Sequence, residues 1–445
     1  MGSPTLTRLQ RCDDGSGPCR FTGSVAISGT GKLPGVMHQR RARARGPDPG
    51  RAPDRLSPGV GRVIKYLGSK RRLVRTISSL ASGCGASTAA DLFTGTTRVA
   101  QELKRQGAFV TAVDTATYSE VFAQCYISAD ATVVDQAELA RAIAELNALP
   151  GRRGYFTEVF CEQSRYLRPE NGARVDAIRD AIEERHRASW LYPIVLTSLL
   201  EAADRVDSTT GLQMAYLKKW APRSFHPLLL RVPELLAGPG RCIRADAREA
   251  VASIGPVDFA YLDPPYNQHR YFTNYHVWET LIRWDAPDHY GVACKRADSR
   301  SAATRSDFNS KLTMPVALAE VVSRIDATVV VVSCNDESWL GRDDLIEMCA
   351  GRGHVELLEF DSKRYVGAQI GIHDLTGQKV GRVSHLRNVE RLAVCGSRAE
   401  VLGAIDAWHQ QVQASDETRS FAGSPSRPVP LGPRTLGSAG GETLR

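Results

Sequence analysis

The middle of the chain repeats one pattern: a short apolar run, a polar or glycine-bearing turn, and then a stretch with helical spacing. The runs cover residues 88–93, 109–114, 257–263, 327–333 and 355–360. Strands that alternate with helices predict βαβ units and a mostly parallel sheet. Ligands of such sheets bind beyond the carboxyl ends of the strands. Gly95, Asp114 and Asp263 stand at the ends of three of these runs, where such a ligand would be met.

A helical pattern fills the long interval between the second and third runs. Val175, Ile178 and Ile182 recur at helical spacing, and residues 212–220 indicate another helix. The interval is too long for one crossover connection, so we expect a helical insertion over residues 129–239. The α/β domain then comprises residues 61–128 and 240–410.

Both ends of the chain differ from this middle part. Residues 1–60 are rich in glycine, proline and arginine, and we expect a disordered basic extension there. It is either an arm that helps to hold DNA or a segment upstream of the true start codon. Residues 411–445 are expected to form a disordered tail. The first 60 residues contain ten Lys and Arg against four Asp and Glu, so most of the net charge of +8 lies outside the domain. Overall charge is therefore no argument that the folded part binds DNA.

Cysteine spacing and hydropathy exclude several classes of protein. The ten cysteines are scattered singly without a Cys-x-x-Cys pair, which favours neither a zinc site nor a disulfide framework. The longest mostly apolar stretch, residues 190–203, is shorter than the about 20 residues of a membrane span. No secretory signal is visible at the N-terminus. We expect a cytoplasmic protein without a membrane segment.

The tetrapeptide Asp263-Pro264-Pro265-Tyr266 closes one predicted strand. The exocyclic amine of adenine is a poor nucleophile because its lone pair is delocalised into the ring. The carboxylate of Asp263 and the carbonyl oxygen of Pro264 could each accept a hydrogen bond from this amine and so localise its lone pair. The prolines stiffen the turn, and Tyr266 offers a flat face to a base flipped out of a duplex. The structural alternative is a proline turn that merely closes the strand, with Tyr266 packed in the core.

Two segments upstream suit a nucleotide-type ligand. Residues 91–97 run from a strand through Gly95 into a helix, a turn that presents backbone amides to a ligand. Asp114 ends the next strand about 20 residues later, where an acid that binds ribose is expected. Residues 65–70 combine an aromatic ring, a turn and a cation ahead of a probable helix. Taken singly, each segment is explained as well by an ordinary turn or strand end.

In this order, the three segments resemble the D12 class of N6-adenine-specific DNA methyltransferases, the family of the bacterial DNA adenine methylase. That family carries a Tyr/Trp-x-Gly-x-Lys segment, a Phe-x-Gly-x-Gly segment, a helical target-recognition region and then Asp-Pro-Pro-Tyr. The resemblance runs from about residue 63 to 396 and extends to residues 271–280 and 333–337. It implies a Rossmann-like class I methyltransferase sheet with an inserted helical target-recognition domain.

The resemblance also implies roles for individual residues. The catalytic loop is Asp263, Pro264, Pro265 and Tyr266. The residues implied to contact S-adenosylmethionine, beside Asp263 itself, are Tyr66, Lys70, Phe93, Gly95, Asp114 and Asp246. Asp114 would bind the ribose and Asp246 the adenine of this cofactor, and no metal is required.

One residue departs from the family pattern. Thr97 stands where the family usually has its second glycine. A β-branched residue resists positive φ and brings bulk close to the ligand. This departure puts the cofactor affinity, and even the activity, in question.

The implied function is site-specific transfer of a methyl group from S-adenosylmethionine to N6 of adenine in double-stranded DNA. The enzyme would act in a restriction-modification system, with a cognate restriction endonuclease, or as an orphan methylase. A monomer on DNA, associated with the bacterial nucleoid, is expected. After the catalytic segment, Lys295, Arg296 and Arg300 are placed to meet a DNA groove.

Other functions stay open at this point. An RNA adenine methyltransferase would use the same loop, whereas enzymes that methylate a protein amide generally carry Asn where this chain has Asp263. A nicotinamide-dependent oxidoreductase lacks support because the Gly-x-Gly-x-x-Gly fingerprint is missing. A DNA-binding homologue with impaired catalysis is conceivable because of Thr97.

Overall fold

The computed structural model describes residues 64–66, 70, 72–267, 270–363, 372–373, 379–381 and 387–420. Some expectations lie outside these residues: the extension over residues 1–60, the turn at residues 67–69, and residues 421–445 of the tail. Helix α14 spans Arg398–Ser420, so it continues past residue 410, where we expected the domain to end.

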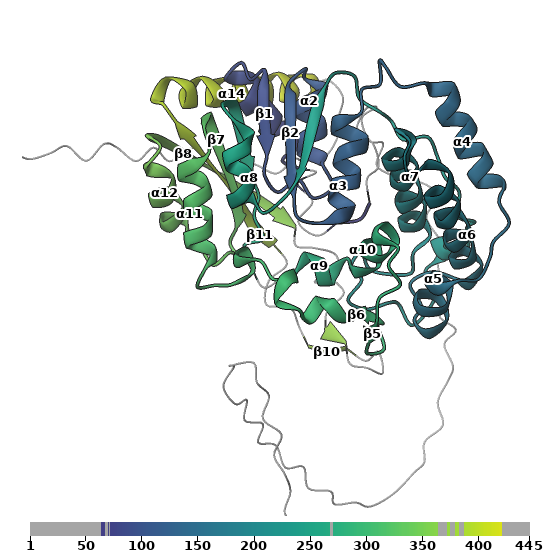
Figure 1. Cartoon of the computed structure of the whole chain (residues 1–445). Coiled ribbons are helices and arrows are strands. Elements are labelled where there is room, and N and C mark those ends of the chain that lie inside the picture. Colours follow the sequence, from purple (N-terminus) through teal and green to yellow (C-terminus); the bar gives the residue numbers. More distant parts are fainter. Residues whose placement is uncertain are drawn as a thin grey trace, which may run out of the picture. The chain divides into compact units, whose positions relative to one another are not determined.

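A seven-stranded sheet with the order β3-β2-β1-β4-β7-β11-β8 organises the fold (Figure 1). Its strands are β1 Thr88–Asp91, β2 Phe109–Asp114, β3 Gly240–Arg244, β4 Val257–Leu262, β7 Ala327–Asn335, β8 His354–Lys363 and β11 Arg387–Gly396. Strands β3, β2, β1, β4 and β7 pair in parallel, whereas β11 runs antiparallel to both β7 and β8. The prediction of an α/β fold with a mostly parallel sheet is confirmed, and the two antiparallel pairings of β11 make the sheet mixed.

Two strands of the seven-stranded sheet, β3 and β11, were not predicted, and both lack a continuous apolar run. Strand β3 lies at the edge of the sheet, and its residues are only partly buried or exposed. The first half of β11 is polar and charged, with Asn388, Glu390 and Arg391. Both strands form because a neighbouring strand offers its backbone donors and acceptors, which a local sequence pattern does not reveal.

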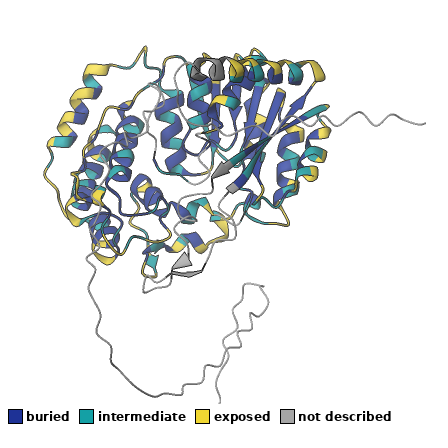
Figure 2. Cartoon of the chain, turned by 180° about the vertical axis from the view of Figure 1, so that it is seen from behind, coloured by how far each residue is buried: buried dark blue, intermediate teal, exposed yellow. Residues whose placement is uncertain are grey.

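Helices cover both faces of the sheet, and alternate strand residues separate into two cores. Val329 and Val331 of β7 pack in the core beneath one layer of helices, whereas Val330 and Val332 pack in the other. The first layer contains α1 Val74–Gly83, α2 Arg98–Arg105, α3 Thr117–Ala123 and α14. The second contains α8 Ala247–Ile254, α11 Met314–Arg324 and α12 Arg342–Ala350. Figure 2 shows the strands as the most deeply buried part and the outer helix faces as exposed.

A helical segment connects α3 to β3. It comprises the π-helix η1 Gln124–Ser128, α4 Gln136–Ala148, α5 Tyr155–Thr157, the π-helix η2 Glu158–Gln163, α6 Pro169–His186, α7 Leu191–Val206 and the 3-10 turn η3 Pro222–Phe225. Helix α6 begins at the expected proline, which is favoured in the first helical turn. Ile194 and Leu199 of α7 lie in the same hydrophobic core as Phe122 of α3. The segment therefore shares the core of the α/β part of the molecule.

The prediction of a helix over residues 212–220 is wrong, because this stretch is an irregular connection. Gln213 ties it to a neighbouring helix: its backbone N–H donates to the carbonyl oxygen of Asn274 at 2.8 Å, and its side-chain oxygen accepts from the backbone N–H of Val277 at 2.9 Å. These tertiary hydrogen bonds replace the bonds that a helix would make within itself.

A compact run of short elements follows β4. It contains α9 Tyr271–Asn274, α10 His276–Arg283, the hairpin of β5 His289–Tyr290 and β6 Lys295–Arg296, and the 3-10 turns η4 Ala297–Arg300, η5 Ala302–Thr304 and η6 Asp307–Asn309. A second small ladder pairs β9 Ile372–His373 with β10 Lys379–Gly381. Within the described residues, no helix has both the length and the apolar character that crossing a membrane requires.

Candidate active site

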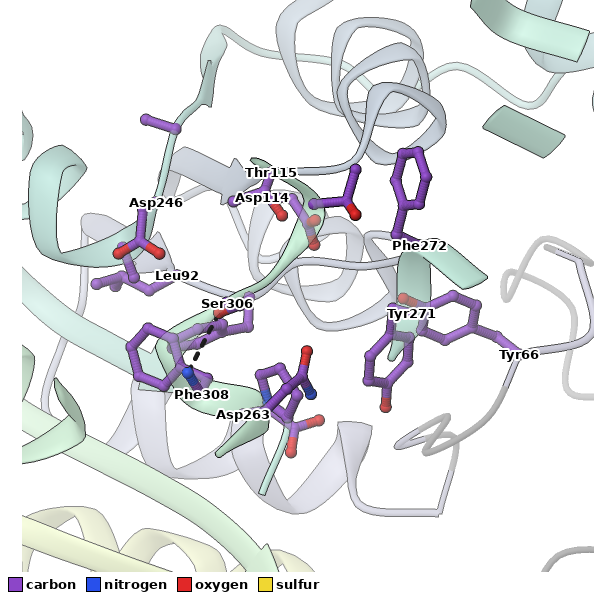
Figure 3. A pocket seen from close by; sticks show the side chains of 16 residues that line it. Tyr66, Leu92, Asp114, Thr115, Asp246, Asp263, Tyr271, Phe272, Ser306 and Phe308 are labelled. Carbon is purple, nitrogen blue, oxygen red and sulfur yellow. Dashed lines mark hydrogen bonds between the residues drawn. The ribbon is translucent and has the colours of Figure 1, made fainter. Parts of the chain in front are cut away.

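A pocket opens at the carboxyl ends of the central strands. Because β2 and β3 lie on one side of β1 whereas β4 and β7 lie on the other, the ends of β1 and β4 form the switch point at which such sheets bind ligands. The pocket is lined by Tyr66, Leu92, Phe93, Asp114, Thr115, Ala245, Asp246, Ala247, Asp263, Pro265, Tyr271, Phe272, Thr304, Ser306, Phe308 and Asn309. In Figure 3, Asp263 lies between the side formed by Phe308 and the side formed by Tyr66 and Tyr271.

Most of the residues singled out in the sequence meet here. Those that line the pocket are Tyr66, Phe93, Asp114, Asp246, Asp263 and Pro265. The others, Lys70, Gly95, Pro264 and Tyr266, lie outside its lining. Lys70 and Tyr266 are buried next to Asp263, and Gly95 contacts both Tyr66 and Asp114.

Asp114 is held mainly by backbone groups. Its Oδ2 accepts the backbone N–H of Gly95 at 2.8 Å, and its Oδ1 accepts that of Ala116 at 3.0 Å. Burial raises the pKa of Asp114, and these backbone hydrogen bonds oppose the rise. A carboxylate has about four acceptor positions, so both oxygens keep capacity for a ligand hydroxyl.

Gly95 occupies a position that only glycine fills easily. Its φ is +51°, and a Cβ there would lie 3.0 Å from the Tyr66 ring. That ring stacks on Tyr275 with centroids 4.7 Å apart and on Tyr271 at 5.3 Å. The close approach at Gly95 thus places the loop after β1 against an aromatic wall of the pocket.

Asp246 caps α8 and connects two walls of the pocket. Its Oδ1 accepts the backbone N–H of Arg248 at 3.0 Å, and the Arg248 guanidinium pairs with Asp307 at 2.7 Å. Asp307 begins η6, where Phe308 contacts Phe93 edge to face at a centroid distance of 4.9 Å. This wall, residues 304–309, was not predicted. It lies far along the chain from the motifs and shows no pattern of its own.

Lys70 lies between two carboxylates next to the pocket. Its Nζ is 3.1 Å from Oδ1 of Asp263 and 3.2 Å from Oε2 of Glu390, and its side chain is only 6% exposed. It also lies 3.4 Å from the hydroxyl of Tyr266. Glu390, on β11, was not predicted because no local motif surrounds it.

Asp263 is partly buried, and its Oδ1 is a buried oxygen without a hydrogen-bond partner. The contact with Lys70 is an ion pair by distance but does not have hydrogen-bond geometry, so Oδ1 has no hydrogen-bond partner among the described residues. Burial raises the pKa of Asp263 to about 6, and the positive charge of Lys70 opposes this rise. A buried acceptor without a donor carries a free-energy cost that a ligand N–H group can remove.

Thr97 has the strained backbone expected for its position. Its φ is 60°, in the left-handed region that costs a β-branched residue about 1–2 kcal/mol. Its side chain is buried, accepts a hydrogen bond from Gln101 Nε2 at 2.9 Å, and does not line the pocket. Crowding of the ligand by Thr97 stays a prediction, and the strain at this position lies in the backbone.

The basic residues after α10 separate into two kinds. Arg296 is 1% exposed and pairs with Asp285 and Asp298 at 2.7 Å each, so it anchors the hairpin and is not available to DNA. Arg300 is exposed and lies 3.6 Å above the ring centroid of Tyr290. The expectation of a DNA contact is wrong for Arg296 and stays a prediction for Arg300 and Lys295.

Sequence comparison shows which family and which known proteins this chain is similar to. Residues 66–340 match the family described as the D12 class of N6 adenine-specific DNA methyltransferases. The chain is similar to the type II methyltransferase M.NlaIII of Neisseria lactamica, with 27% identity over 317 residues that cover 68% of this chain and 92% of the relative. It is also similar to the modification methylase StsI of Streptococcus sanguinis, with 28% identity over 63% of this chain and 45% of the relative. A third relative is the modification methylase LlaI of Lactococcus lactis subsp. lactis, with 26% identity over 68% of this chain and 51% of the relative.

The family match begins at Tyr66, includes residues 91–97 and 263–266, and ends at residue 340. It covers residues from every strand of the parallel half of the sheet. The chain therefore belongs to the D12 class of N6-adenine-specific DNA methyltransferases.

Proposed function

We propose that Asp263 and the carbonyl oxygen of Pro264 orient N6 of a flipped adenine for methyl transfer. The observation that carries this proposal is that Asp263 lines the pocket while its buried Oδ1 has no hydrogen-bond partner among the described residues. An amine N–H of adenine is a donor of the right kind, and the paired acceptors would localise the nitrogen lone pair. As the amine takes on positive charge, the carboxylate stabilises it and accepts the displaced proton.

The lining residues fit S-adenosylmethionine, the cofactor that the family implies. The described lining contains three aspartates and no basic side chain, which suits a ligand with a cationic sulfonium centre. We propose that Asp114 holds the ribose hydroxyls, that Asp246 contacts the cofactor's adenine, and that Tyr66, Phe93 and Gly95 border its methionine side. When bound, this cofactor supplies an electrophilic methyl group.

Lys70 has a different role in this proposal from the one expected from the motif alone. Its ammonium is within ion-pair distance of Asp263 and within hydrogen-bond distance of Tyr266. It would keep the carboxylate of Asp263 ionised and fix the aromatic ring of Tyr266, on which the flipped base would stack. A direct contact of Lys70 with the cofactor stays a prediction.

We further propose that the helical segment between α3 and β3 recognises the target sequence in double-stranded DNA. Its exposed basic residues Lys218 and Lys219, together with Arg300 after α10, could meet phosphates. The relatives M.NlaIII, StsI and LlaI are named as type II or modification methylases, which supports a place in a restriction-modification system. A cognate endonuclease is a further partner of this proposal.

Expression in a methylation-deficient bacterial host, followed by sequencing that detects N6-methyladenine, tests the proposal. One enriched sequence motif in the genome is the expected result, and it would define reaction, substrate and specificity together. The empty vector is the control. Unmodified DNA from cells that contain folded protein, with N6-methyladenine in their RNA instead, would favour the RNA methyltransferase.

A further inference from the structure

The cluster around Lys70 contains one carboxylate that no motif contains. Glu390 lies on β11, beyond residue 340, where the family match ends. We propose that Glu390 is a positioning residue for methyl transfer: it draws the ammonium of Lys70 away from Asp263 and so leaves that carboxylate open to the substrate amine. The inference rests on the proposed role of Asp263.

The direction of the hydrogen bonds of Lys70 is the first support. Its Nζ donates to Glu390 Oε2 at 3.2 Å and to the hydroxyl of Tyr266 at 3.4 Å. It approaches Oδ1 of Asp263 at 3.1 Å without hydrogen-bond geometry. An ammonium has three N–H donors, so the bonds to Glu390 and Tyr266 leave at most one donor for Asp263. The positive charge of Lys70 thus lies close to Asp263, while Oδ1 of Asp263 receives no hydrogen bond.

The sheet holds Glu390 in this position. Strand β11 lies between β7 and β8, and Glu390 is opposite Asn335 on one side and Phe360 on the other. Antiparallel ladders on both sides fix the strand, so the side chain of Glu390 faces Lys70 with little freedom. It is 18% exposed, as Asp263 is at 17%, and both pair with the same buried cation.

Removal of the Glu390 charge would change the pKa of Asp263 and its pairing with Lys70. The ionisable groups that interact with Asp263 or with Lys70 include Lys70 itself, Glu390, Asp91, Tyr261, Tyr266, Tyr271 and Cys334. Lys70 is the cation of this set, and Glu390 raises the pKa of Asp263 by like-charge repulsion. Without that charge, Lys70 would pair fully with Asp263. The carboxylate would become a weaker base with an occupied oxygen.

The experiment compares Glu390→Gln with the wild type in steady-state methylation of DNA. We expect kcat to fall by about tenfold, with the KM for DNA and the affinity for S-adenosylmethionine little changed. We also expect the acid limb of kcat/KM against pH to move to lower pH, because this profile reports the free enzyme. Glu390→Asp, which keeps the charge, should return the limb toward its wild-type position.

The matched control is Glu359→Gln. Glu359 lies on β8 and pairs with Arg391, the next residue after Glu390, at 3.0 Å, and it is 22% exposed. Successive strand residues face opposite sides of a sheet, so this change removes a similar ion pair from the other face. The control should leave kcat and the position of the acid limb unchanged.

Three results overturn the inference. A Glu390→Gln enzyme with wild-type kcat and acid limb, or one whose kcat falls while the limb stays in place, excludes the positioning role. Equal losses in Glu390→Gln and Glu359→Gln would indicate a structural ion pair. Failure of the proposed function is distinguishable, because it requires Asp263→Ala to retain methylation.

Discussion

Two aspartates line the same pocket and are held by opposite means. Asp114 receives backbone N–H groups from Gly95 and Ala116, which lie close to it in the sequence. Asp263 is held by the side chain of Lys70, a cation that it shares with Glu390 of β11, two strands away from β4. One carboxylate has a donor on each oxygen, whereas the other has an oxygen without a donor.

In the proposed function, this difference separates a binding residue, Asp114, from a catalytic one, Asp263. A carboxylate fixed by backbone amides has a defined direction that does not depend on distant residues, which suits a group that binds a constant part of a ligand. A carboxylate balanced against a shared cation has an adjustable proton affinity, which suits a group that takes part in the reaction. Changes at the two sites should therefore alter different measured quantities.

Asp263→Ala gives the largest expected effect. It removes the acceptor that would stabilise positive charge on the amine, so kcat should fall by at least about 100-fold. Lys70 keeps Glu390 as a partner, so the fold should persist. Methylation assays with far-UV circular dichroism check both statements, and an active, folded variant would contradict the mechanism.

Lys70→Met should be the next largest change, and it acts on stability as well as on activity. It leaves two partly buried carboxylates without their shared cation, a loss of about 3 kcal/mol in the free energy of unfolding. The pKa of Asp263, about 6 in the wild type, should rise because the charge that opposes burial is gone.

Protonation of Asp263 removes the acceptor, so the acid limb of kcat/KM for Lys70→Met should move to higher pH. This is the opposite direction from the shift expected for Glu390→Gln. A limb that moves the same way in both variants would show that Lys70 and Glu390 do not act through Asp263.

Asp114→Asn tests the binding half of the comparison. The amide nitrogen cannot accept a hydrogen bond, so one of the two backbone N–H groups loses its partner and the loop at Gly95 is loosened. The Kd for S-adenosylmethionine should rise by about tenfold while kcat at saturating cofactor changes little. Calorimetry and saturation kinetics measure the two effects. A selective loss of kcat would break the division between the two aspartates.

Substitutions of Thr97 give the smallest expected effect. They test whether this residue influences stability alone or also the affinity for S-adenosylmethionine. Thr97→Ala and Thr97→Gly both remove the hydroxyl, but only glycine adopts a φ of 60° without strain. The glycine variant should be more stable than the alanine variant by about 1 kcal/mol, as read from denaturant unfolding. Because Thr97 does not line the pocket, the two variants should bind S-adenosylmethionine equally.

The parts of the fold that sequence predicts are those with strong local patterns. Strands β1, β2, β4 and β7 are apolar runs buried between two layers of helices, and α6 begins at Pro169. Strands β3 and β11 and the stretch over residues 212–220 depend on partners elsewhere in the chain, so short windows misjudge them. A helical pattern there was outweighed by the hydrogen bonds of Gln213 to Asn274 and Val277.

The site shows the same division. Tyr66, Phe93, Asp114, Asp246 and Asp263 belong to recognisable motifs and meet in one pocket. Phe308 and Glu390 come from segments with no motif, and their positions follow from tertiary packing alone. Sequence therefore indicates which groups the reaction uses, whereas the controls on those groups become visible only in three dimensions.

Strand β11 is the last strand of the sheet in the chain, yet it lies between β7 and β8, which precede it. During synthesis, β8 cannot join the sheet through its native neighbour until β11 has emerged from the ribosome. Pairing over such sequence separations is slow, so closure of the sheet is a late event in folding. Because β11 carries Glu390, the ion pair between Lys70 and Glu390 forms only when this strand inserts into the sheet.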